Sequence, residues 1–276
     1  MILAGFQEYY WEILLERVRA NQIQFSEEID ICVCVPKGGE NTCNLKQFCK
    51  NYNWSFLQLE EDLLAQAQNV AIRLHPKAEW IYKIDEDIVL SDNYFSKLKQ
   101  AYQSFNNNSY LKIGFCAPMI NINAYGANLF LKTMNLQKDY EKLFGRYAIP
   151  ENWQNAKIHN DSNVAEWIWT HSIPFDKVAN FIEKKNRGFV SICPHRFSIG
   201  AILIKRDYWE KIGGFLVGVI GEMGLEEKIL CEFCMNDMHA IVVAEDVFVG
   251  HLGFYRQKET IRKFFDRNSD SIKRII

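Results

Sequence analysis

Trp80-Ile-Tyr-Lys-Ile-Asp85-Glu86-Asp87 is the stretch that decides the fold, because an apolar run passes directly into three carboxylates. Side chains alternate along an extended chain, so Asp85 and Asp87 are expected to point one way and Glu86 the other. Ligands of α/β sheets collect at the carboxyl ends of the strands. Two carboxylates on one face of such a strand end form half of a site for a hard divalent cation. An acidic turn exposed to solvent is the alternative explanation.

Apolar, strand-like segments alternate with helix-like segments on both sides of this stretch. Strands are expected over residues 1–4, 29–35, 54–59, 80–84 and 113–120. Helices are expected between them, over residues 9–18, 44–52, 63–74 and 94–102. This alternation predicts βαβ units, and hence an α/β fold with a mainly parallel, Rossmann-like central sheet flanked by helices.

The remainder of the chain divides into three parts. Residues 123–197 are rich in Asn, Trp and Lys and have little periodicity, which favours a middle insertion or lid. Strand and helix patterns return over 198–253, and interleaved charged and apolar residues predict a helical tail over 254–276. The chain is therefore expected to be a single domain, 1–276, in which 1–122 and 198–253 form two halves.

The composition excludes several classes of protein. A net charge of −2 gives no general attraction to nucleic acid. The apolar runs are shorter than the roughly 20 residues that a membrane span needs. The first residues lack the features of a secretion signal, so a cytoplasmic protein is expected. Cys32, Cys34 and Cys116 lie in apolar runs, where buried free thiols are expected. Cys231 and Cys234 lack the second ligand pair of a zinc site, so core or half-exposed thiols are expected there.

Two motifs in the first half resemble glycosyltransferases with the GT-A fold, of the bacterial family-2-like type. Gln66-Ala-Gln-Asn69-Val-Ala-Ile is similar to a helix that reads RN-x-G in that family. The strand that ends in Asp85-Glu86-Asp87 is similar to the strand that carries its DxD motif.

The second half of the chain carries three further motifs that resemble this family, in the expected order. They are a GG-F turn, a helix that opens with an acidic pair, and a late strand that ends in Gly-His: Trp209-Glu-Lys-Ile-Gly-Gly214-Phe215, Gly224-Leu-Glu226-Glu227 and Gly250-His251. The resemblance therefore covers most of the chain outside the middle segment and the tail.

The resemblance implies metal-dependent transfer of a sugar from a nucleotide-diphosphate sugar, with a UDP-sugar as the main expectation. The acceptor would be a saccharide or a lipid-linked saccharide. A divalent cation, manganese or magnesium, would be held by Asp85, Asp87 and His251. The nucleotide would be bound by residues from several elements: Phe6, Val35, Asn69, Asp85 and Glu86.

The acidic pair implies how the acceptor is activated. An inverting transferase needs a base that takes the proton from the acceptor hydroxyl. The resemblance assigns this role to Glu227, with Glu226 beside it in the catalytic site and Glu222 as a weaker candidate. A favourable interaction of carboxylates with the helix macrodipole is the alternative explanation of the pair.

The sequence departs from the family pattern at the nucleotide site. Phe6 has flanking residues that differ from those of the usual base-contacting aromatic residue. Val35-Pro36-Lys37 stands where an acidic residue is common, and Gln68 replaces the Arg before Asn69. These differences leave the identity of the base open.

Two groups of side chains fit two explanations each. Tryptophans of the middle segment suit either a platform for sugar rings or burial in the core: Trp153, Trp167 and Trp169. Basic residues of the tail suit either a solvated helix face or peripheral contact with the inner face of a membrane: Arg256, Lys258, Arg262 and Lys263.

The expected setting, from the resemblance, is bacterial surface-polysaccharide assembly. A nucleotidyltransferase is the alternative enzyme, but it would need a Gly-rich basic loop after the first strand, where Gly5-Phe6-Gln7 stands. A non-catalytic carbohydrate-binding protein on the same fold is the alternative without turnover. The oligomeric state is left open.

Overall fold

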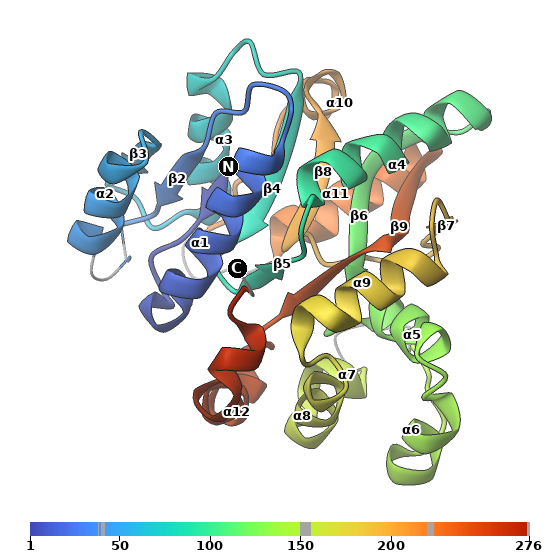
Figure 1. The fold of residues 1–276 in the computed structure, drawn as a ribbon. Coiled ribbons are helices and arrows are strands. Elements are labelled where there is room, and N and C mark those ends of the chain that lie inside the picture. The colour runs from blue at the N-terminus through green and yellow to red at the C-terminus, as the bar shows by residue number, and fades with distance from the viewer. Residues whose placement is uncertain (38, 40–41, 150–155, 220–223, 275–276) are drawn as a thin grey trace.

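A computed structural model describes residues 1–37, 39, 42–149, 156–219 and 224–274, which form helices packed around one central sheet (Figure 1). The strands are β1 (Ile2–Leu3), β2 (Cys32–Val35), β3 (Ser55–Gln58), β4 (Trp80–Asp85), β5 (Ile88–Leu90), β6 (Lys112–Ile120), β7 (Val190–Ile192), β8 (Ala201–Lys205) and β9 (His239–His251). The helices are α1 (Glu8–Gln24), α2 (Thr42–Asn51), α3 (Leu64–Leu74), α4 (Tyr94–Asn108), α5 (Ala124–Thr133), α6 (Gln137–Phe144), α7 (Lys157–Asn160), α8 (Ser162–Thr170), α9 (Phe175–Lys185), α10 (Arg206–Lys211), α11 (Leu225–Asn236), a 3₁₀ turn, η2 (Tyr255–Gln257), and α12 (Lys258–Ile272).

The sheet has the order β3-β2-β1-β4-β8-β6-β9-β5, and β7 pairs with β9. Strands β1 to β4 pair in parallel, as do β6 and β9. Strand β8 is antiparallel to both of its neighbours, and β5 and β7 are antiparallel to β9. Consequently β1, β2, β3, β4, β6 and β9 all run in one direction, so the expected α/β fold with a mainly parallel sheet is confirmed.

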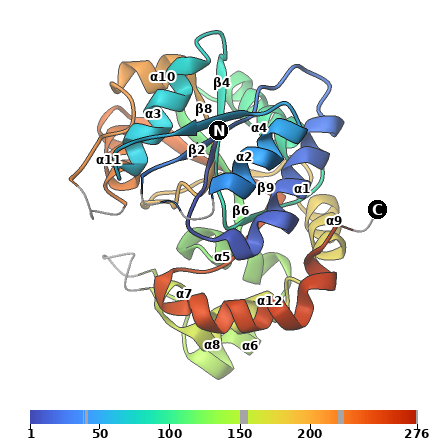
Figure 2. The same ribbon diagram turned by 90° about the vertical axis from the view of Figure 1, so that its left-hand side faces the viewer.

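Helices cover both faces of the sheet. Figures 1 and 2 show α1, α4 and α9 on one face and α3, α10 and α11 on the other. All residues of β2 are therefore buried, and so are nearly all of those of β6. A strand buried on both faces leaves polar chemistry to its ends, which is where Asp85 lies.

Residues 123–197 contain more regular structure than their weak periodicity predicted. They form α5 to α9 and β7. Asn123 begins α5 by accepting hydrogen bonds from the backbone of Tyr125 and Gly126, and Asp161 caps α8 in the same way. Because β7 pairs with β9, this segment is built into the sheet. The division of the chain into two halves around it stays a prediction.

The expected amphipathic tail is η2 and α12. Ile261, Phe264 and Phe265 are buried, and α12 packs against α8 and α9. Figure 2 shows α7, α8 and α12 together below the sheet. All eight cysteines are free thiols, and all except Cys43 are buried, as expected. Within the described ranges, no helix is both long enough and apolar enough to cross a membrane.

Candidate active site

The acidic stretch lies where β4 ends, between β1 and β8. Leu3 pairs with Asp85 across the parallel ladder, and the Asp85 backbone N–H donates to the Gly200 carbonyl oxygen at 2.7 Å. The strand end is therefore fixed on both sides, by segments that are distant in sequence.

Asp85 is bound on one side and open on the other. Its Oδ1 accepts a hydrogen bond from the ammonium of Lys83 at 2.5 Å. Its Oδ2 has no hydrogen-bond partner among the residues that the structure describes, and a Cβ added to Gly200 would lie 3.5 Å from it. Burial raises the pKa of Asp85 to about 6, although the Lys83 ammonium opposes this shift.

Asp87 and His251 meet at the same edge. The His251 Nε2 lies 3.5 Å from Asp87 Oδ2, and the two side chains are 10% and 14% exposed. Asp87 Oδ2 also accepts a hydrogen bond from Gln7 Nε2 at 2.9 Å. Burial alone would raise the pKa of Asp87, but His251 and Gln7 lower it overall. The resemblance assigned Asp87 and His251, which are far apart in the sequence, to one site, and the geometry brings the two side chains together.

The three predicted metal ligands do not form a closed coordination shell. Among the described residues, no group of three or more His, Cys, Asp or Glu side chains is arranged to hold a metal ion. Asp87 and His251 approach each other, whereas Asp85 turns one oxygen toward Lys83.

Glu86 and Asp87 form the turn between β4 and β5, so the alternation expected of an extended chain ends at Asp85, and the Glu86 carboxylate binds the chain itself. Its oxygens accept hydrogen bonds from the backbone N–H groups of Gly5 and Phe6, at 2.9 and 2.8 Å. A third comes from the indole of Trp11 at 2.6 Å. We expected Glu86 to contact a nucleotide directly. In the structure its carboxylate instead fixes the loop between β1 and α1.

Phe6 and Val35 differ in what they can contact. The Phe6 side chain is 45% exposed on the loop that Glu86 holds. Val35 is fully buried, and a Cβ added to Gly5 would lie 2.7 Å from its Cγ1. Gly5 packs directly on the Val35 side chain, so Val35 supports the loop. In this arrangement the Val35 side chain cannot make the direct contact with a base that we had expected.

Asn69 is also occupied by the chain. Its Nδ2 donates to the Phe215 carbonyl oxygen at 2.7 Å, and its Oδ1 accepts from the Phe215 N–H at 2.9 Å. The GG-F turn precedes this contact, with Gly214 at a φ of +88°, a conformation that favours glycine. Asn69 therefore joins α3 to the turn after α10. This differs from the expected nucleotide contact, because both polar ends of the amide are used.

The acidic pair opens α11, as predicted. Glu227 Oε1 accepts from Arg196 Nε at 2.7 Å, and Oε2 accepts from the Ile199 N–H at 3.2 Å. Arg196 also donates to the Gly224 carbonyl oxygen at 2.8 Å. Burial raises the pKa of Glu227, against the opposing effect of Arg196.

Glu226 lies beside Glu227 in the first turn of α11. Its side chain is partly exposed, and its charge contributes to raising the pKa of both Asp85 and Glu227. The acidic pair and the acidic strand end are therefore close enough to interact. Glu222 lies outside the described residues.

The aromatic residues of the middle segment mainly pack. Trp169 is fully buried, and its indole N–H donates to the His251 carbonyl oxygen at 2.9 Å. Trp167 packs edge-on against Tyr140 and at a tilt against His171. Trp169 thus supports the end of β9 instead of facing a sugar, and Trp153 lies outside the described residues.

Three polar residues of this edge were missed by the sequence: Gln7, Lys83 and Arg196. Each binds a predicted site carboxylate, namely Asp87, Asp85 and Glu227. Only Lys83 carried a local signal, because a lysine two residues before Asp85 in a buried strand shares its face.

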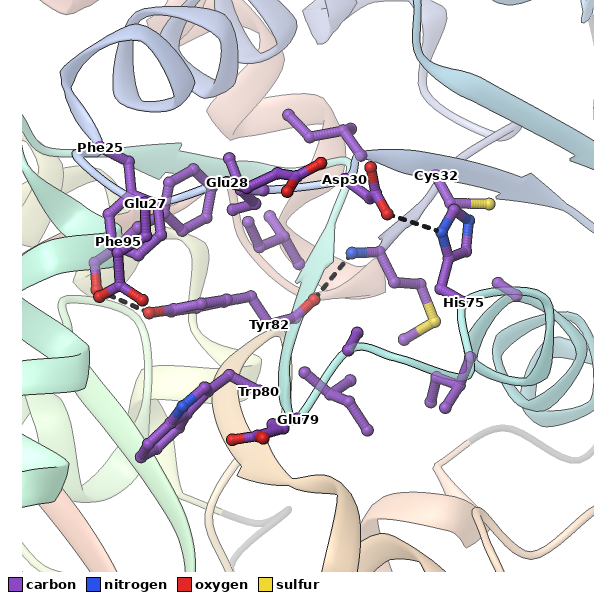
Figure 3. Close-up of a pocket in the computed structure, with 18 of the residues that line it drawn as sticks. Phe25, Glu27, Glu28, Asp30, Cys32, His75, Glu79, Trp80, Tyr82 and Phe95 are labelled. Carbon is purple, nitrogen blue, oxygen red and sulfur yellow. Dashed lines mark hydrogen bonds and ion pairs between the residues drawn. The ribbon is translucent and has the colours of Figure 1, made fainter.

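A cavity of about 530 Å³ lies at the opposite edge, where the strands begin (Figure 3). Trp80, Tyr82 and Cys32 line it, together with Asp30 and His75, whose side chains are 3.4 Å apart. None of the predicted site residues lines this cavity.

The comparisons with known proteins establish the fold. No protein-family model matches the chain, and no curated protein matches its sequence. Among solved structures, a crystal structure of GalNAc-T7 with UDP, GalNAc and Mn²⁺ matches with a TM-score of 0.55 and 12% sequence identity. The match covers 96% of this chain and 47% of that one, so the chain spans about half the length of the matching structure. The expected GT-A-like fold is confirmed.

Proposed function

We propose that the chain is a glycosyltransferase that moves a sugar from a nucleotide-diphosphate sugar to a saccharide acceptor with the help of a divalent cation. One observation carries this proposal: Asp87 and His251 converge at 3.5 Å beside Asp85, at the carboxyl ends of β4 and β9. Ligands of this class of sheet bind at that edge. The fold is that of a structure determined with UDP, GalNAc and Mn²⁺.

The side chains at this edge fit a hard divalent cation by their chemistry. Carboxylate oxygens suit magnesium and manganese, and imidazole also binds manganese. Asp87 and His251 would hold the ion, with the free Oδ2 of Asp85 next to it. When bound, such an ion neutralises the charge that develops on the departing diphosphate.

The loop between β1 and α1 would hold the nucleotide. Glu86 fixes the backbone of Gly5 and Phe6, and the exposed ring of Phe6 is available to stack on a base. A UDP-sugar is the donor that the comparison favours, because the matching structure contains UDP. A nucleotidyltransferase needs basic residues in this loop to bind a triphosphate. The loop has no Lys or Arg, which disfavours that alternative.

The acidic pair would act on the acceptor. In a single displacement with inversion, the acceptor oxygen bonds to the anomeric carbon while the bond from that carbon to the diphosphate oxygen breaks. The diphosphate leaves with the bonding electrons, and the acceptor proton passes to a carboxylate. Glu227 suits this role because burial raises its pKa and Arg196 fixes its orientation, as general-base catalysis requires.

Manganese-dependent turnover of nucleotide sugars tests the proposal. A panel of nucleotide-diphosphate sugars is incubated with the chain, and release of the nucleotide diphosphate is measured with and without a saccharide acceptor. Release should require Mn²⁺ or Mg²⁺, stop on chelation and return when the ion is added back. Turnover that is indifferent to chelation, or no turnover and no nucleotide binding across the panel, would contradict the proposal.

A further inference from the structure

Lys83 is a buried cation next to the proposed donor site, and it has no part in the function proposed above. Its residue is 1% exposed, although an ammonium without partners is costly to bury. Its Nζ donates to Asp85 Oδ1 at 2.5 Å and to the Ile199 carbonyl oxygen at 2.8 Å. Both acceptors belong to the candidate site, so contacts within the site offset the cost of burying the Lys83 ammonium.

The position of Lys83 follows from the strand. Lys83 and Asp85 are two residues apart on β4, so their side chains lie on the same face. Lys83 pairs with Ile202 of β8, which brings the segment before β8 within reach of its ammonium. The lysine therefore lies one step behind the carboxylate, away from the open edge.

This contact decides which oxygen of Asp85 is free. With Oδ1 held by Lys83, Oδ2 is the oxygen left on the side of Gly200, where the absence of a side chain leaves room. A carboxylate with one oxygen tied down has few ways to rotate, so its second oxygen is presented in a fixed direction. Without the Lys83 ammonium, the Asp85 carboxylate would be free to rotate, and its Oδ2 would no longer have a fixed direction.

Ile199 extends the contact to the acceptor side. Its carbonyl oxygen accepts from Lys83, and its N–H donates to Glu227 Oε2 at 3.2 Å. The backbone of one residue therefore touches both the Asp85–Lys83 pair and the Glu227–Arg196 pair. Arg196 is the corresponding cation on the acceptor side.

We infer that Lys83 is a positioning residue, which holds Asp85 so that its free oxygen is presented to the nucleotide–cation complex. This inference rests on the proposed function, because it concerns the same site. It adds a residue that touches neither the nucleotide nor the cation and acts only through Asp85.

Binding of Mn²⁺ in the presence of UDP, measured by calorimetry, tests the inference without turnover. Lys83→Met should weaken Mn²⁺ binding by about tenfold or more, the usual effect of removing a partner that orients a ligand. Lys46→Met, which alters an exposed lysine of α2, should leave binding unchanged. Equal affinity in wild type and Lys83→Met would overturn the inference. Absence of binding in the wild type would instead contradict the proposed function.

A double-mutant cycle distinguishes positioning from a general structural role. If Lys83 acts through Asp85, Lys83→Met should have little further effect in an Asp85→Asn background, within about twofold, because coupled residues are not additive. The double variant buries no unpaired charge, and in Asp85→Asn alone Lys83 keeps the amide oxygen and the Ile199 carbonyl oxygen as acceptors, so this comparison remains available if Lys83→Met alone fails to fold. A further loss of about tenfold in the double variant would show that Lys83 acts independently of Asp85 and would overturn the inference.

Discussion

Asp87→Ala is expected to lower nucleotide-sugar turnover by about a thousandfold or more. The proposed cation stabilises the departing diphosphate by several kcal/mol, and each 1.36 kcal/mol is about tenfold in rate. Asp87 is the carboxylate that faces His251 directly, at 3.5 Å, so its removal takes away the oxygen ligand on which the site depends most. Initial rates at saturating donor, over a series of Mn²⁺ concentrations, measure the effect.

The fold should survive this change, because the backbone contacts of Asp87 are independent of its side chain. Its carbonyl oxygen still accepts from the Leu252 N–H. Asp270→Ala is the matched control, since that side chain is 95% exposed on α12. A folded Asp87→Ala variant with wild-type turnover would contradict the proposed metal site.

Glu227→Gln is expected to lower the turnover number by about a hundredfold or more, the usual contribution of a general base. The substitution keeps the shape of the side chain and removes its basicity. Donor affinity should change little, because the proposed cation, and not Glu227, would bind the diphosphate, and Asp85, Asp87 and His251 would hold that cation. Turnover number and donor KM, measured separately, give this contrast.

Two further variants make the test specific. Glu226→Gln should be milder if Glu226 only orients the acceptor or favours the helix start. Glu232→Gln, on the same helix with a side chain 45% exposed, should have no effect. If Glu226→Gln abolishes turnover and Glu227→Gln retains it, the two residues have the opposite roles. If both variants retain wild-type turnover, the acidic pair only stabilises the start of α11, and the catalytic base lies elsewhere.

The fold and the edge that carries the candidate site were predictable because they follow from local patterns. An apolar run that ends in Asp85-Glu86-Asp87 indicates both a buried strand and the position of its polar end. The turn at Glu86 and Asp87 was not predicted, because the period of an extended chain holds only to the end of β4 at Asp85. The meeting of Asp87 with His251 came from the resemblance, which placed two distant motifs in one site.

The roles of Asn69, Val35 and Glu86 were not predictable in the same way. Asn69 binds the backbone of Phe215, and Glu86 binds the loop at Gly5 and Phe6. Both contacts join segments far apart in the chain, and they depend on how close the backbones approach. A sequence pattern marks such residues as important without showing whether they bind a ligand or the protein.

The middle segment shows a related limit. Its helices are short, and two of them, α5 and α8, begin at the polar caps Asn123 and Asp161, so each helix contains only a few turns from which a pattern could be recognised. The strand β7 joins the sheet only by pairing with β9, which no local pattern predicts.

A crystal structure with UDP and Mn²⁺ tests the central claim most directly. We expect the cation between Asp87 and His251, the diphosphate beside Asp85 at the carboxyl ends of β1 and β4, and the base near Phe6. Anomalous scattering from the manganese would locate the ion independently of the nucleotide. UDP in the cavity lined by Trp80 and Tyr82, or against α5 to α9, with no ion at Asp87, would contradict the account.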